Sequence, residues 1–165
     1  MNLSWSVPRG VLAAAIAGMS VMSAVSTASS QTHTTVLFMC PHGAAKSVLA
    51  SAYFQRAAKE RGLKVRVLSV GIDPDTQIAP AVVAHLKRTG YDVPIAKPQR
   101  ATAHDLSSAD VVISIGCDLT GLPAPTGTIV RWDDVPAPSE DFARADATIK
   151  ERVVQLVDEL VRKQR

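Results

Sequence analysis

The feature that most constrains the fold is a short loop that joins an apolar run to a helix-like stretch. The run Val36–Met39 has the continuous apolar character of a strand buried on both faces. The loop 40–47 (CPHGAAKS) follows, and then a helical pattern from Val48 to Arg61. Backbone N–H groups of such a loop and the N-terminus of the helix form an anion site, which also favours the thiolate of a cysteine placed there. The segment therefore predicts a nucleophile, Cys40, beside an oxyanion site; the alternative is a buried cysteine before a turn.

Strand and helix signals alternate along the rest of the chain. This β-α-β-α-α-β-β-α order predicts an α/β domain with a single doubly wound, four-stranded parallel sheet and helices on both faces. We expect strands at 36–39, 65–71, 111–115 and 128–132, and helices at 48–61, 80–90, 102–109 and from a Ser139 cap to about Lys163.

The first 28 residues have the pattern of an export signal. Arg9 is the only charged residue among them, and the apolar stretch Val11–Val25 leads into small residues that suit cleavage after residue 28 or 30. The stretch is short for a membrane-spanning helix, which needs about 20 residues; an uncleaved anchor is the alternative. We expect an exported protein, periplasmic or secreted, with no stable membrane association after cleavage.

We expect residues 34–164 to form one domain with a single core. Their composition excludes several classes of protein. The formal net charge of the chain is +3, without charge runs or interleaved aromatic residues, so no nucleic-acid partner is expected. Two cysteines, Cys40 and Cys117, permit a disulfide but are too few for a disulfide scaffold. No paired-ligand spacing such as Cys-x-x-Cys occurs, so we expect no metal and no cofactor. We expect His85 to lie on the polar, solvated side of its helix.

Several reactive residues follow predicted strands. Cys40, Cys117 and the pair Asp133 and Asp134 each come after one, and the carboxyl ends of parallel strands meet at one edge of a sheet, where ligands bind. His42 lies inside the loop, where it either binds an oxyanion or faces solvent. For Cys117 the alternative is a small core residue at a strand end.

With these features the chain resembles the low-molecular-weight protein tyrosine phosphatases and the arsenate reductases that share their fold. The resemblance extends from Val36 to about Leu160 and includes the strand-Cys-loop-helix start, the turn 70–72, the strand beginning at Asp110 and the segment at Trp132. In that family the loop reads Cys, five residues, Arg, then Ser or Thr. The resemblance implies Cys40 as nucleophile, Ser47 as hydrogen-bond partner of its thiolate, and oxyanion binding by His42, Gly43, Ala44, Ala45 and Lys46.

Three departures from the family pattern point to a divergent branch. Lys46 replaces the arginine, so the charge is kept while the bidentate fork is lost. Gly43 replaces an asparagine that usually shapes the loop. The family's general acid is an Asp followed by Pro; here Asp134 is favoured for it, Asp133 is the alternative, and an alignment on the last proline replaces the acid by Ala137.

The resemblance leaves two chemistries open. In hydrolysis of phosphate monoesters, including phosphotyrosine, Cys40 attacks phosphorus and Asp134 protonates the leaving alcohol. In arsenate reduction, Cys117 attacks Cys40 and a thiol reductant then reopens the disulfide. Thioredoxin-coupled reductases of the family carry a cysteine within one residue of this place and a further one where Leu122 stands. Both chemistries require a small oxyanion or a phosphorylated substrate; a catalytically inactive oxyanion binder or thiol redox sensor is the alternative of another class.

Overall fold

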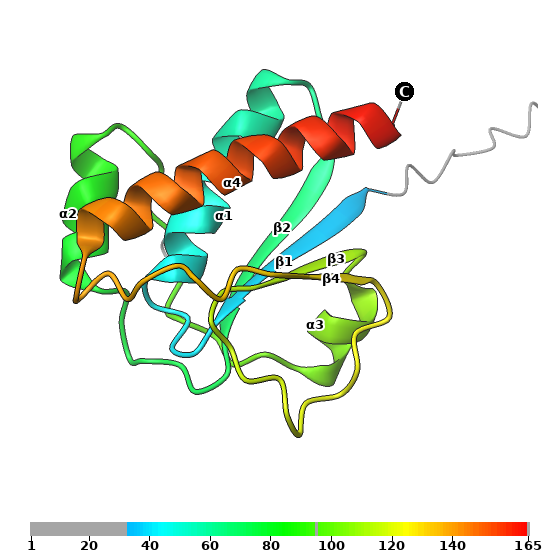
Figure 1. Cartoon of the computed structure of the whole chain (residues 1–165), viewed down its shortest axis with the longest axis horizontal. Helices are drawn as coiled ribbons and strands as arrows, with labels where there is room; N and C mark the ends of the chain where they lie inside the picture. The colour runs from blue at the N-terminus through cyan, green and yellow to red at the C-terminus, as the bar shows by residue number, and fades with distance from the viewer. Residues whose placement is uncertain (1–32, 95, 165) are drawn as a thin grey trace, which may run out of the picture. The chain divides into compact units, whose positions relative to one another are not determined.

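Four parallel strands form one sheet in the computed structural model, which describes residues 33–94 and 96–164. The sheet order is second, first, third, fourth, so the first strand of the chain lies in the interior of the sheet (Figure 1). The predicted fold class is therefore confirmed. The expected export signal, residues 1–28, lies outside the described residues. The strands are β1 (Thr34–Cys40), β2 (Val65–Gly71), β3 (Val111–Ser114) and β4 (Thr128–Arg131).

The helices cover both faces of the sheet. Figure 1 shows the first, second and last helices on one side and the short third helix on the other. The core between them includes Leu37, Phe38 and Met39 of β1, which have no exposed surface. Every helix in the described part of the chain is too short or too polar to cross a bilayer. The helices are α1 (Lys46–Glu60), α2 (Pro80–Arg88), α3 (Ala103–Ser108) and α4 (Phe142–Lys163).

The last helix begins later than expected. Asp141, and not Ser139, caps it: the Asp141 carboxylate accepts a hydrogen bond from the backbone N–H of Arg144 at 3.0 Å. The prediction failed because the preceding residues form a turn, in which the N–H groups of residues 140 and 141 both donate to the carbonyl of Ala137. This turn extends the connection by two residues before α4 begins.

Strand register places the two cysteines on neighbouring strands. Met39 of β1 is paired with Ser114 of β3, and the N–H of Ile115 donates to the carbonyl of Met39 at 2.8 Å. Cys40 ends β1, and Cys117 lies in the turn that follows β3. Both therefore lie at the carboxyl edge of the sheet, where ligands of such sheets bind.

Candidate active site

Three carbonyl groups of the loop 40–47 accept hydrogen bonds from the segment 73–79, which follows β2, so they face away from the interior of the loop. In a trans peptide the carbonyl and the next N–H point in opposite directions. The N–H groups of residues 42, 43 and 45 therefore face the inside of the loop, where an anion would lie. The three bonds run from Asp73 N to Pro41 O (2.9 Å), from Asp75 N to His42 O (3.0 Å) and from Ala79 N to Ala44 O (3.0 Å).

The N-terminus of α1 adds to this cradle. Ala45 occupies the N-cap position, its side chain offers no capping hydrogen bond, and the first turn contains no acidic residue. The first N–H groups of a helix have no partner within the helix. Here they point towards the interior of the loop together with the positive end of the helix dipole, which is a suitable arrangement for a tetrahedral oxyanion.

Gly43 has a backbone conformation that explains its departure from the family pattern. Its φ is +61°, in the left-handed region, which glycine adopts freely and asparagine tolerates. A Cβ on Gly43 would also lie 2.7 Å from the backbone nitrogen of Gly71. Glycine in place of asparagine therefore keeps the shape of the loop and allows β2 to approach it closely.

Cys40 and Ser47 lie together at the base of the loop. Cys40 is 3% exposed, and its thiol donates a hydrogen bond to Ser47 Oγ over 3.3 Å. The Ser47 side chain is completely buried. The structure thus brings the predicted nucleophile and its predicted partner into contact.

Lys46 extends its ammonium group towards two other segments. Nζ donates to the carbonyl of Val135, at 3.5 Å, in the connection between β4 and α4. A Cβ on Gly116, just after β3, would lie 2.8 Å from the same nitrogen, and Gly116 has a φ of +63°. The lysine therefore links the oxyanion loop to the segment that contains Cys117, a contact that the sequence did not reveal.

Cys117 is a buried free thiol, as Cys40 is. Its pKa is raised to about 11, first by burial and then by the electrostatic effect of the neighbouring Cys40. The Ser114 hydroxyl, the Ile115 amide and the positive charge of Lys46 act in the opposite direction. The two thiols are thus close enough to influence each other, and Cys117 is protonated at neutral pH.

The predicted general acid, Asp134, lies outside the lining of the cleft that contains Cys40. The Asp134 carboxylate accepts a hydrogen bond from Arg152 over 2.6 Å, which lowers the pKa of Asp134. Asp133 pairs with Arg131 at 2.8 Å. Neither aspartate lines the cleft that contains Cys40. A general acid has to reach the leaving group, so either aspartate would have to leave its arginine partner to act as one. The assignment of Asp134 as the general acid stays a prediction.

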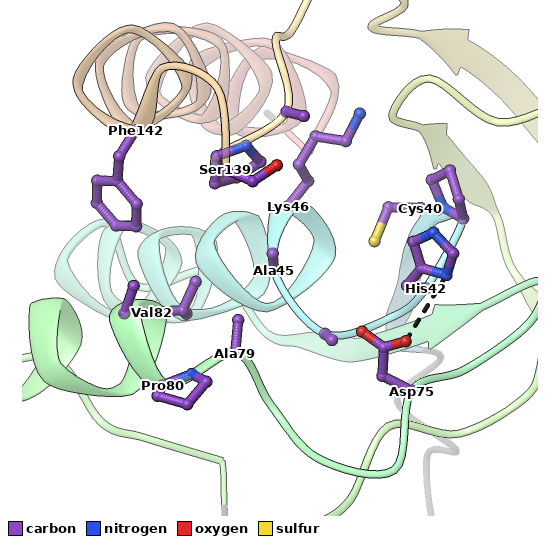
Figure 2. Close-up of a pocket in the computed structure, with 15 residues that line it drawn as sticks. Cys40, His42, Ala45, Lys46, Asp75, Ala79, Pro80, Val82, Ser139 and Phe142 are labelled. Atoms are coloured by element: carbon purple, nitrogen blue, oxygen red, sulfur yellow. Dashed lines mark ion pairs between the residues drawn. The ribbon is translucent and has the colours of Figure 1, made fainter.

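His42 lies at the rim of the site. Its Nδ1 is 3.8 Å from a carboxylate oxygen of Asp75, and the side chain is 65% exposed (Figure 2). The same nitrogen is 3.3 Å from the carbonyl of Asp73. Its backbone N–H faces the loop interior, whereas its ring faces Asp75.

An apolar cleft of about 440 Å³ begins at Cys40. Figure 2 shows it running from Cys40 past the start of α2 towards Phe142. The sequence did not reveal this cleft because its walls come from three segments far apart in the chain. Its apolar walls are formed by Ala44, Ala45, Ala79, Pro80, Val82 and Phe142.

A buried polar network supports the far wall of the cleft. The prediction that His85 is solvated is wrong: the residue is 8% exposed, and its Nε2 lies 3.1 Å from both Tyr53 Oη and an Asp146 carboxylate oxygen. Tyr53 donates to Asp146, and Lys150 pairs with Asp146 at 2.7 Å. The ring centroids of His85 and Phe142 are 5.0 Å apart, so Phe142 packs against a residue of this network.

These features define a class of protein: a parallel α/β domain with a cysteine nucleophile in an amide-lined oxyanion loop. The family model described as low molecular weight phosphotyrosine protein phosphatase matches residues 35–121, just over half of the 165 residues. The chain belongs to this family.

Relatives with similar sequences include arsenate reductases. A Halobacterium salinarum protein named "Putative arsenate reductase" is 29% identical over 127 residues, 74% of this chain and 89% of that protein. The thioredoxin-dependent arsenate reductase of Corynebacterium glutamicum is 27% identical with a TM-score of 0.66, over 79% of this chain and 63% of that one. This chain thus spans less than two thirds of the Corynebacterium protein. The arsenate reductase of Archaeoglobus fulgidus is 28% identical with a TM-score of 0.61, over 74% of this chain and 98% of that one. Family and relatives together support an enzyme of the phosphatase-like hydrolase or arsenate reductase kind.

Proposed function

We propose that this protein reduces an arsenic(V) oxyanion through Cys40 and Cys117. The observation that carries the proposal is the second buried thiol, which lies after the strand next to β1 and responds to the charges of Cys40 and Lys46. Hydrolysis of an alkyl phosphate would need a proton donor, and Asp134 is bound to Arg152. The three relatives described above, which are 27–29% identical to this chain, each carry the name arsenate reductase.

In the first step, Cys40 attacks the arsenic of bound arsenate. The N–H groups of residues 42, 43 and 45, the N-terminus of α1 and the Lys46 ammonium hold the oxygens, while Ser47 Oγ stabilises the thiolate. An S–As bond forms, and one arsenic hydroxyl leaves as water. Water is a small leaving group that can take its proton from solvent, so the step is less dependent on a general acid.

In the second step, Cys117 attacks Cys40. Formation of the S–As bond removes the negative charge of Cys40, which is one of the causes of the raised pKa of Cys117, while Lys46 continues to act in the opposite direction. The Cys117 thiolate forms a disulfide with Cys40 Sγ, the S–As bond breaks, and its electron pair stays on arsenic. Arsenic(III) leaves as arsenite, and an external thiol reductant regenerates both cysteines by exchange.

The experiment that tests this function measures both chemistries in one preparation. Reduced, oxygen-free protein mixed with arsenate is expected to release one arsenite and to lose two titratable thiols. Cys117→Ser should release none, and Cys40→Ser is the blank. Hydrolysis of p-nitrophenyl phosphate that survives Cys117→Ser, without arsenite release, would instead assign a phosphatase. Oxyanion binding without either reaction would leave the inactive binder.

We also propose that the protein is exported and that its leader, residues 1–28, is removed. Arg9, the apolar stretch Val11–Val25 and the small residues after it support this. Mass spectrometry of the mature protein should find an N-terminus between residues 29 and 31. A full-length species that requires detergent for extraction would show that the segment is an anchor.

A further inference from the structure

The cleft at Cys40 is much larger than an inorganic oxyanion requires. Sites for organic small molecules have volumes of roughly 300–1,000 Å³, and this cleft has about 440 Å³. A tetrahedral anion bound by the loop amides would occupy only the end at Cys40. The rest of the cleft extends along α2 towards α4, away from the charged groups (Figure 2).

The two ends of the cleft have different chemistry. Lys46 and the loop amides lie beside Cys40, whereas Ala79, Pro80, Val82 and Phe142 line the opposite part. Apolar walls favour an apolar group because its burial removes hydrocarbon surface from water. A ligand that fits both ends is an oxyanion with an organic substituent attached to its central atom.

Phe142 gives the organic end an aromatic wall that is supported from behind. Its ring packs against the His85 ring at 5.0 Å, and His85 is in turn held by Tyr53 and Asp146. Aromatic rings prefer offset or edge-to-face contacts with other rings. A wall that does not have to be ordered on binding favours an aryl substituent over a short alkyl group.

The positions of the acids decide which oxyanion carries the aryl group. Asp75, a carboxylate of the lining, lies at the Cys40 end with an oxygen 3.8 Å from His42 Nδ1, and not at the apolar end (Figure 2). An aryl phosphate must release its aryl oxygen, and Asp134, the predicted donor, pairs with Arg152 outside the cleft. In an arylarsonate the ring is bonded to arsenic directly and stays there, so no leaving group of this kind needs a proton. The geometry points to aromatic arsonates as substrates of the Cys40 site, an inference that rests on the proposed reduction.

The reaction balances with the two thiols of the chain. Cys40 Sγ bonds to arsenic(V), and one arsenic hydroxyl leaves as water. Cys117 then bonds to Cys40 Sγ, the S–As bond breaks, and arsenic keeps its electron pair as arylarsonous acid. Arsenic gains two electrons, the two thiols lose two, and the carbon–arsenic bond remains intact. An external dithiol reduces the Cys40–Cys117 disulfide.

The test compares phenylarsonate, methylarsonate and arsenate. The reduced protein is mixed with each under anaerobic conditions, trivalent products are separated by chromatography with arsenic detection, and mass spectrometry follows the disulfide. We expect kcat/KM for phenylarsonate to exceed that for methylarsonate at least about tenfold. Phe142→Ala should lower this ratio severalfold. Val154→Ala, on the same helix but 43% exposed, should leave it unchanged.

Each outcome separates this inference from the proposed function. Reduction of arsenate without preference for phenylarsonate over methylarsonate overturns the inference and leaves the proposed function intact. No disulfide with any arsenical overturns both. A preference that Phe142→Ala leaves unchanged also overturns the assignment of the cleft, provided that circular dichroism shows the variant folded.

Discussion

Substitution of Gly116 by alanine should displace the Lys46 ammonium while disturbing the fold very little. A Cβ on Gly116 would lie 2.8 Å from Lys46 Nζ, a separation that real Cβ atoms do not show. The nitrogen is the far end of a flexible side chain, so it can move away at small energetic cost. Gly121 in the same connection is a matched control, since its φ is +80° and nothing lies within 4 Å of its Cβ position.

The expected loss of stability is nearly the same for both variants. A residue with a Cβ in the left-handed region costs about 1–2 kcal/mol. Alanine also lowers the conformational entropy of the unfolded chain relative to glycine, and this effect offsets about 0.4–1 kcal/mol of that cost. The net loss is about 1 kcal/mol, or about 4 °C in Tm for a domain of this size.

The expected effects on activity differ. Removal of one preorganised donor from an oxyanion site lowers turnover about 10²- to 10³-fold, and a displaced ammonium should lower it at least about tenfold. We expect this decrease in single-turnover arsenite release for Gly116→Ala and not for Gly121→Ala, with thermal unfolding measured on both. Equal activity of the two variants would refute the assignment of Lys46 to the site.

Three further predictions concern the stability of the fold. Gly43→Ala should destabilise the protein more than Gly121→Ala in urea unfolding, because its Cβ would meet backbone atoms of β2 that cannot move aside; equal midpoints would contradict the close approach. The pKa of Cys117 is raised from 9.0 to about 11, so its protonated thiol stabilises the folded state below pH 9.0 and this contribution is lost as the pH rises through about 11. Between these pH values wild type should therefore lose more stability than Cys117→Ser, and parallel pH profiles would contradict the raised pKa. Asp146→Asn should lower the free energy of unfolding by about 1–3 kcal/mol because it weakens a buried hydrogen-bond network; exposed Glu151→Gln is the control, and equal effects would contradict the importance of the network.

The fold could be predicted because local patterns and packing agree along this chain. Val36–Met39 is a continuous apolar run and became the buried core of β1. Gly62 ends the first helix, with a φ of +69°, and Pro80 opens α2 at its first position. The edge that collects Cys40 and Cys117 followed from the rule that parallel strands bring their carboxyl ends together.

The parts that could not be predicted depend on contacts between distant segments. The environment of Lys46 depends on Gly116 and Val135, and nothing in the local sequence links the three. His85 has a polar side chain on an amphipathic helix, so it suggested a solvated position. Its burial is explained by partners on α1 and α4, which helical spacing within α2 does not reveal.

The interior position of β1 has a consequence for the order of folding. The nucleophile ends the first strand of the domain, yet that strand needs β3, more than 70 residues later, to complete its pairing. Parallel sheets built from such distant partners fold slowly. During synthesis Cys40 is thus made long before the strands and helices that bury it. Its protection from premature oxidation therefore depends on how rapidly the rest of the sheet assembles around it.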